Sequence, residues 1–268
     1  MLISASATSG WNCTPKLRPR RYACTATKVR ASTVAPGGGV RASKCHWNHG
    51  PGSSQDPSFQ KPTTALNAHG GAVVRPEGCK WLNYEGEIAI VIGRTARNVS
   101  PAEAGAYIRG YTVADDYGLH DFRDTDAGSM LRVKGSDTLC PLGPGLVEGW
   151  DFRGKTLRTY VNGEVKQEAN TDEMEWDMHY LVADIARTIT LHPGDVLLSG
   201  TPANSRTVYP GDVVEVEVEG LGRLTNHIVT GPAAVRTDVG AQPSESEEVL
   251  STAQGGDWEF RGIRPPRR

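Results

Sequence analysis

The chain has 268 residues, of which 38% are hydrophobic, and its mean hydropathy is -0.41. This length is enough for one large domain with a sizeable core, and we expect a soluble globular protein. A formal net charge of -2 argues against nucleic acid as a partner, and no apolar run approaches the length of a membrane span.

The first 55 residues differ in composition from the rest of the chain. They hold eight of the 29 basic residues and none of the 31 acidic ones, and they are rich in Ser, Ala, Arg, Gly and Thr. Three interpretations remain open: an organellar transit peptide, plain disorder, or a misassembled start of the sequence. We predict that residues 1–55 are disordered or targeting-like rather than a folded module.

The five cysteines are spread along the chain without a CxxC pair. This spacing indicates neither a zinc site nor a disulfide framework. It fits a reducing compartment, and we predict a cytoplasmic location, with organellar import as the alternative that the basic N-terminal segment allows.

Two carboxylates, Glu85 and Glu87, stand at the head of the apolar run 88–92. The run predicts a buried strand, and because side chains alternate along a strand, both glutamates share one face. Two like charges this close are costly unless a positive charge lies between them. Hard divalent cations take oxygen ligands, so Mg²⁺ or Mn²⁺ is a natural partner. A solvated edge strand is the alternative.

The next segment returns more carboxylates to the same place. Residues 100–103 form a capping box with Pro at the first helical position, which predicts a short helix that ends at Gly110. The β-prone run 111–114 then ends on Asp115 and Asp116. Strand, helix and strand in this order bring the new carboxylates towards the first two. An oxygen-only site with three carboxylates suits Mg²⁺ and leaves positions open for water or substrate.

The rest of the chain alternates strands and turns. Residues 157–161 and 164–167 flank an Asn-Gly pair, which predicts a type I′ hairpin, and we interpret the surrounding stretch, 151–169, as scaffold. Asp177 is placed to cap a helix with an apolar stripe that packs into the core. Valines and glutamates alternate over 213–219, and we interpret these glutamates as a solvated sheet face, not as metal ligands.

Many short strands and two convincing helices predict a β-dominated α+β fold. The segment 231–268 is prominent in Pro, Gly, Ser and Glu, and we predict a disordered tail there.

Five blocks of the sequence, in this order, resemble the fumarylacetoacetate hydrolase superfamily: LNYEGEIAIVIGR, GYTVADDYGLHDF, LRVKGSDTLCPLGP, LHPGDVLLSGTPAN and PGDVVEVEVEGLGRLTN. The resemblance extends over about residues 57–229. Within the family, the third block and the hairpin LRTYVNGEVKQEA most resemble the homoprotocatechuate branch. That branch contains 5-oxopent-3-ene-1,2,5-tricarboxylate decarboxylase and 2-hydroxyhepta-2,4-diene-1,7-dioate isomerase. The resemblance implies a mixed β-roll of the family's C-terminal type, a catalytic domain over 56–230 and a homodimer.

The resemblance also implies roles for individual residues. Asp115 would be a near neighbour of the metal ligands, and Lys134 would point into the site, where it stabilises negative charge or acts as a base. Two further residues would contact substrate, with Thr201 on a carboxylate. The implied Mg²⁺ or Mn²⁺ ligands are Glu85, Glu87 and Asp116, the implied catalytic residue is Lys134, and the implied substrate-binding residues are Thr201 and Lys61.

Two positions depart from the family pattern. His120 stands where the family commonly has arginine, and we predict that it lies behind the site or at the surface. The family's lid usually carries a His and Glu acid/base pair ahead of the Lys-Pro block. This chain has HWNHG at residues 46–50 and no glutamate there, so the pair is in doubt.

The resemblance implies a metal-dependent decarboxylase or isomerase of 2-oxo (enol) di- or tricarboxylates in aromatic-compound catabolism. Two alternatives stay open. One is a C–C bond hydrolase of the acylpyruvate or fumarylacetoacetate type, and the other is a catalytically weak or silent metal-binding member of the family.

Overall fold

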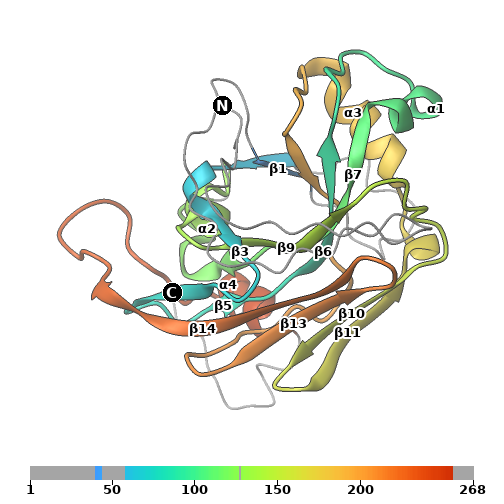
Figure 1. Ribbon diagram of the computed structural model, residues 1–268. Helices are drawn as coiled ribbons and strands as arrows, with labels where there is room; N and C mark the ends of the chain where they lie inside the picture. Colours follow the sequence, from blue (N-terminus) through green and yellow to red (C-terminus); the bar gives the residue numbers. More distant parts are fainter. Residues whose placement is uncertain (1–39, 44–57, 127, 256–268) are drawn as a thin grey trace, which may run out of the picture.

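The computed structural model describes residues 40–43, 58–126 and 128–255, with the backbone alone for 40–43 and 58. The predicted lid residues 46–50 and most of the segment 1–55 lie outside this range. Strands dominate, and they form three sheets (Figure 1). The prediction of a β-dominated α+β fold of the β-roll type is confirmed.

The larger sheet has seven strands and carries the predicted metal strand near its centre. In spatial order it consists of β2 (Ser58–Lys61), β1 (Val40–Ser43), β12 (Val196–Leu198), β6 (Gly86–Ile92), β7 (Ile108–Asp115), β9 (Cys140–Val147) and β3 (Leu66–Ala68). β6 pairs antiparallel with both β12 and β7. β1 lies inside the segment 1–55 for which disorder was expected.

The second sheet has five strands and lies across one side of the first (Figure 1). Its order is β11 (Glu164–Asn170), β10 (Thr156–Val161), β13 (Val213–Val218), β14 (Gly222–Ala234) and β4 (Ala72–Glu77). β10 and β11 form the predicted hairpin, and Asn162 and Gly163 both have positive φ, 53° and 82°, as a type I′ turn requires. A third, two-stranded sheet pairs β5 (Leu82–Asn83) with β8 (Gly118–Leu119).

Helices are few and short in the described part of the chain. They are α1 (Pro101–Ala104), α2 (Leu131–Gly135), α3 (Met178–Thr188) and α4 (Glu247–Gln254), with single 3-10 turns at Thr63–Ala65, Gly105–Tyr107, His120–Phe122 and Thr171–Glu173. The predicted capping box is present in α1, but the helix gives way to a 3-10 turn at Gly105, before the predicted end at Gly110. Asp177 caps α3 by accepting a hydrogen bond from Tyr180 N at 2.8 Å. None of the described helices is long and apolar enough to cross a bilayer.

The main core lies between the two large sheets and α3. Ile88 and Ile90 of β6 pack with Val216 of β13 and with Leu181 and Ile185 of α3. The predicted apolar stripe of α3 is core as far as Ile185, whereas Ile189, the last residue of the stripe, is 37% exposed. The alternation predicted for β13 is confirmed, since its three even-numbered valines are buried. This packing holds β6 rigidly between two layers.

The chain beyond residue 230 differs from the expected disordered tail over the part that the structure describes. β14 runs on to Ala234, and α4 places Val249, Leu250 and Ala253 in a small buried cluster with Trp81. Ser246 caps α4 by accepting a hydrogen bond from Val249 N at 3.2 Å. Tertiary contact with Trp81 compensates for a composition that favours disorder. Residues 256–268 lie outside the described range.

Candidate metal centre

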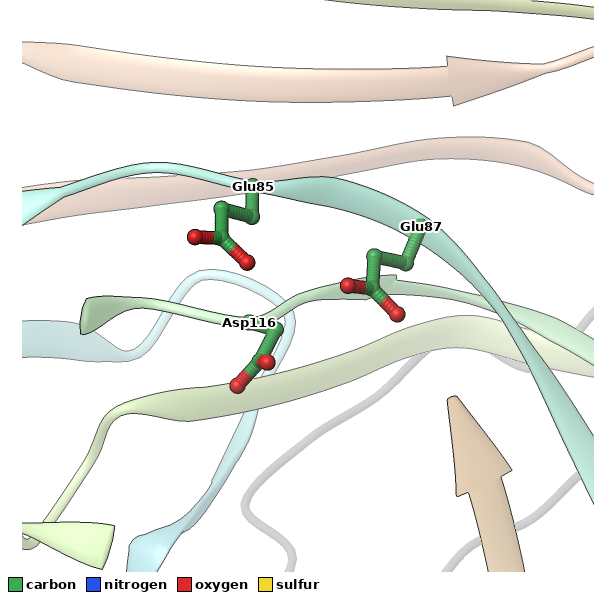
Figure 2. A group of neighbouring side chains, drawn as sticks. All are labelled: Glu85, Glu87 and Asp116. Atoms are coloured by element: carbon green, nitrogen blue, oxygen red, sulfur yellow. The ribbon is translucent and has the colours of Figure 1, made fainter. Parts of the chain in front are cut away.

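The register of β6 against β7 sets the geometry of the centre. Gly86 pairs with Asp115, and the N–H of Asp116 donates to the carbonyl of Glu85 at 2.8 Å, so Asp116 stands opposite Glu85. Glu85 and Glu87 lie on the same side of the strand, as predicted. Figure 2 shows the carboxylates of Glu85, Glu87 and Asp116 gathered in one region.

The three carboxylates can reach one common ion. Each offers an oxygen, and these oxygens all lie within 4.8 Å of one another. All three side chains are buried, at 4%, 2% and 2% exposure for Glu85, Glu87 and Asp116. Hard oxygen ligands of this number suit Mg²⁺ or Mn²⁺ and leave further coordination positions open.

Glycine between the two glutamates lets the strand approach the second sheet. A Cβ on Gly86 would lie 2.1 Å from Thr159 Oγ1 of β10 and 3.0 Å from Val216 Cγ1 of β13. Any larger residue would therefore force these side chains or β6 itself to shift. Because side chains alternate along a strand, Glu85 and Glu87 point away from that sheet.

Two buried ammonium groups partly neutralise the carboxylates. Lys134 Nζ lies 2.7 Å from Glu85 Oε2 and 3.2 Å from Asp116 Oδ2, and it donates to the carbonyl of Asp116 at 2.7 Å. Lys61 Nζ forms an ion pair with Asp116 Oδ1 and donates to the carbonyl of Leu139 at 3.0 Å. Both lysines are fully buried. The structure thus brings the two predicted lysines together with the three predicted ligands.

The charge of the centre is not fully balanced by these lysines. Burial, with repulsion from Asp116 and Glu85, raises the pKa of Glu87 well above its ordinary value. Glu87 Oε2 accepts a hydrogen bond from Gly200 N at 2.8 Å. A carboxylate destabilised in this way is suited to a bound cation, so the donor set fits a divalent metal.

The electrostatics of Lys134 favour the charged form. Burial opposes the ammonium charge, but attraction from Asp116 and Glu85 prevails and raises the pKa of Lys134 above its ordinary value. A base role for Lys134 therefore requires that another positive charge neutralise the carboxylates. As it stands, Lys134 is a hydrogen-bond donor with a positive charge.

Asp115 supports the centre from behind. Its Oδ1 accepts a hydrogen bond from Glu85 N at 2.8 Å, and burial raises its pKa to about 7. It does not belong to the group of three that can share an ion. Its placement matches the predicted role of near neighbour.

His120 is buried, with 1% exposure, so a surface position for it is excluded. A Cβ on Gly118 would lie 3.0 Å from His120 Nε2 and 3.3 Å from Lys134 Nζ. His120 Nε2 and Lys134 Nζ therefore both approach the same backbone position, Gly118. The neighbouring Asp121 has a structural role, since its carboxylate accepts from the N–H groups of Lys80 and Trp81, both at 2.8 Å.

Thr201 lies near the start of the loop that follows β12, directly after Gly200, whose N–H donates to Glu87 Oε2. Its hydroxyl accepts a hydrogen bond from Gln167 Nε2 at 3.0 Å. Sequence reasoning missed Gln167, because it treated residues 151–169 as scaffold alone. No local pattern marks this residue, since a glutamine on a hairpin strand is common.

A cleft of about 360 Å³ opens nearby. Its lining contains two cations and two tyrosines, and none of the three clustered carboxylates contributes to it. The lining residues are Tyr84, Val161, Lys166, Asn204, Arg206, Thr207, Tyr209 and Gln254. The metal centre and this cleft are therefore separate features.

Comparison of the sequence with known protein families identifies the family of this chain. Residues 31–229 match the family described as fumarylacetoacetate (FAA) hydrolase C-terminal. The chain belongs to this family, as its sequence blocks predicted.

The relatives include enzymes of aromatic degradation. The chain is 41% identical over 179 residues to a 4-hydroxyphenylacetate degradation bifunctional isomerase/decarboxylase of Salmonella dublin, and the match covers 66% of this chain and 42% of that protein. It thus corresponds to less than half of that relative. A mitochondrial oxaloacetate tautomerase of Rattus norvegicus is 33% identical, with 64% of this chain and 58% of that protein covered.

A solved structure shows the same fold. The 5-carboxymethyl-2-hydroxymuconate delta-isomerase from Mycobacterium smegmatis superposes with a TM-score of 0.70 at 38% identity. The superposition covers 72% of this chain and 77% of that one.

Proposed function

We propose that the protein is a divalent-metal-dependent decarboxylase or isomerase of 2-oxo (enol) di- or tricarboxylates in aromatic-compound catabolism. The observation that carries the proposal is the convergence of three buried carboxylates and two buried lysines in one site. The names of the relatives support the reaction class, since they include isomerases and an isomerase/decarboxylase.

In this proposal Glu85, Glu87 and Asp116 hold Mg²⁺ or Mn²⁺. The ion, when bound, acts as a Lewis acid towards the carboxylate and 2-oxo oxygens of the substrate. Gly200 N–H and the surrounding core keep the Glu87 carboxylate in place. Buried ligands with fixed partners are pre-organised for binding.

Lys134 supplies a second positive charge. Negative charge develops on the substrate oxygen as CO₂ leaves, or as a proton migrates along the diene. A buried ammonium stabilises that charge more strongly than water does, because it is already oriented and the local dielectric is low. His120 approaches Gly118, as the Lys134 ammonium does.

Thr201 and Lys61 are proposed to position the substrate. Thr201 offers a hydroxyl to a distal carboxylate, and Lys61 lies at the centre, where it offsets the charge of Asp116. Holding both ends of a dicarboxylate fixes the scissile or migrating bond relative to Lys134, which lowers the entropic part of the barrier.

A metal-dependence assay tests the proposal. The full chain, stripped with EDTA and reloaded with Mg²⁺ or Mn²⁺, is incubated with a panel of 2-oxo dicarboxylates. We expect metal-dependent CO₂ release from oxaloacetate or a tricarboxylate analogue, or metal-dependent enol–keto conversion followed by absorbance. Cleavage of acetylpyruvate instead would favour the hydrolase. A metal-dependent spectral change without turnover would favour the silent family member.

The homodimer and the cytoplasmic location are part of the same proposal. The family resemblance supports the dimer, and Cys79 and Cys140, which are free and buried, fit a reducing compartment. Light scattering on the purified chain tests the dimer, since a mass near 28.8 kDa would mean a monomer.

A further inference from the structure

Gln167 connects the metal strand to the loop that carries Thr201. It lies on β11 and its side chain is 1% exposed. Its Oε1 accepts a hydrogen bond from Gly86 N at 3.2 Å, and Gly86 stands between the two glutamates of the metal centre. Its Nε2 carries two N–H protons, and its two shorter contacts are the carbonyl of Pro202 at 2.8 Å and Thr201 Oγ1 at 3.0 Å; the carbonyl of Ala203, at 3.3 Å, shares one of these protons.

The backbone determines which way the Gln167 amide faces. Gly86 N–H is a donor, so it must meet the amide oxygen. The carbonyls of Pro202 and Ala203 are acceptors, so they must meet the amide nitrogen. The reversed amide would place like groups against each other at three contacts, and a buried polar atom without a partner is costly.

This orientation in turn determines the polarity of Thr201. Because the group facing the hydroxyl is an N–H donor, the oxygen of Thr201 accepts there and its proton points elsewhere. Thr201 follows Gly200, whose own N–H is directed to Glu87 Oε2. The loop thus carries two donors in succession, the N–H of Gly200, which is directed to a metal ligand, and the hydroxyl of Thr201.

We propose that Gln167 is a positioning residue: it fixes the Thr201 hydroxyl as a hydrogen-bond donor and thereby selects ligands that place an acceptor-only group, a carboxylate, at that point. The inference deepens the proposed function and rests on it for the identity of the ligand. The arrangement itself, a single buried amide tying β6 to residues 201–203, stands on the contacts alone.

Kinetics of three variants test the coupling. Gln167→Ala, Thr201→Val and the double variant are assayed with Mg²⁺ and the dicarboxylate that the wild type turns over. We expect each single change to raise KM by about 10-fold to 100-fold, the range for a lost hydrogen bond to a charged group, with a smaller effect on kcat. The KM of the double variant should be no higher than that of Thr201→Val alone, because both changes remove the same hydrogen bond, from Gln167 Nε2 to Thr201 Oγ1. If the increase in KM in the double variant equals the product of the two single increases, the proposal is wrong.

Asn226→Ala is the matched control. Asn226 is also a buried amide, at 1% exposure, and its Nδ2 donates to the carbonyls of Ala68 and Gly71 at 2.9 and 2.8 Å. It contacts neither Thr201 nor the carboxylates, so its loss should lower Tm and leave KM unchanged. If Asn226→Ala raises KM as much as Gln167→Ala does, the effect of Gln167 is general destabilisation and the proposal is wrong.

Hydrogen exchange separates this inference from the proposed function. In the full-length chain without substrate, Gln167→Ala should accelerate amide exchange in the loop of residues 199–203, whereas Asn226→Ala should not. If the wild type acts on no 2-oxo dicarboxylate, the proposed function fails while this measurement still decides whether Gln167 holds the loop. Unchanged exchange at 199–203 would show that it does not.

Discussion

The chain carries two Glu-x-Glu patterns on strands, and they have opposite environments. Glu85 and Glu87, at the start of β6, are 4% and 2% exposed and face two buried lysines and a third carboxylate. Glu215 and Glu217, on β13, have side chains that are 22% and 39% exposed, and both pair with Arg223. The same spacing thus produces a candidate metal centre in one sheet and a solvated face in the other.

The difference lies in what covers each strand. β6 stands near the middle of its sheet, between β12 and β7, and buried lysines of β2 and α2 cover the face that carries its glutamates, so these glutamates find compensating charge inside the protein. The outward face of β13 is reached by water, and arginine and water satisfy its glutamates. Periodicity indicates which side chains share a face, and the elements packed over that face decide whether it is buried or solvated.

The largest expected effect on metal binding and activity follows from removing a carboxylate of the buried Glu85 and Glu87 pattern. Glu85→Ala should abolish tight Mg²⁺ binding and lower any activity by at least about 100-fold, since one charge-bearing group of the site is removed. Calorimetry with Mg²⁺ and the decarboxylase assay measure the two effects. Glu217→Ala, the exposed counterpart, should leave both unchanged. Full activity in Glu85→Ala would remove the metal hypothesis.

Lys134→Gln should separate charge stabilisation from metal binding. The change removes a cation from among the carboxylates, so Mg²⁺ binding should be retained or strengthened while kcat falls by about 100-fold. Stability should fall as well, by about 3–5 kcal/mol in the metal-free protein, because the buried carboxylates lose their partner. Loss of Mg²⁺ binding with retained kcat would contradict the assigned role.

The pH dependence of stability should have opposite signs for the two patterns. The folded-state pKa of Glu87 is raised, so in the metal-free protein this group destabilises the fold increasingly as pH rises above its ordinary pKa of about 4.3. Glu87→Gln should therefore stabilise the EDTA-treated protein relative to wild type at pH 8 more than at pH 5. Urea unfolding across this range provides the measurement.

Glu217 should behave in the reverse way, with a smaller effect. Partial burial opposes its charge, but hydrogen bonds from Arg223 and Tyr160 prevail and lower its pKa. The ionised Glu217 therefore contributes to the stability of the fold above the ordinary pKa of a glutamate, and this contribution is lost as pH falls through the pKa of the folded state. Glu217→Gln should thus destabilise slightly at pH 8 and less near pH 4. A stabilising effect at pH 8 would mean that this face is not simply solvated.

The smallest expected effect on stability is that of removing Arg223, the arginine that pairs with the exposed glutamates. Arg223→Ala should cost less than about 1 kcal/mol, because exposed ion pairs contribute little and salt screens them. Thermal unfolding at low and high ionic strength checks both statements. No change in Mg²⁺ affinity is expected. A change there would show that the two sheets are coupled electrostatically.

Much of the fold followed from local patterns. The capping box at Ser100, the Asp177 cap and the Asn162-Gly163 turn are all present, because each depends on neighbours in the sequence. α4 did not follow in the same way. Its composition favours disorder, and the contact with Trp81, far away in sequence, holds it in place.

The candidate site was predictable to the same extent. Glu85 and Glu87 follow from strand alternation, and Asp116 from the return of the next strand, while Lys61, Lys134 and Thr201 came through resemblance to a family. Gln167 could not be predicted from its own surroundings, since a glutamine on a hairpin strand is common. Its role depends on Gly86 and on the loop at Thr201, which are distant in the chain.

The sequence by itself determined the family, the strand-rich architecture and the oxygen-bearing residues that can hold a divalent ion, because these depend on residue type, order and short-range periodicity. The tertiary structure alone decided which acidic pair is buried, which amide sets the direction of the Thr201 hydroxyl, and where the last helix packs. Those outcomes depend on contacts between segments that lie far apart in the sequence and meet only in the folded chain.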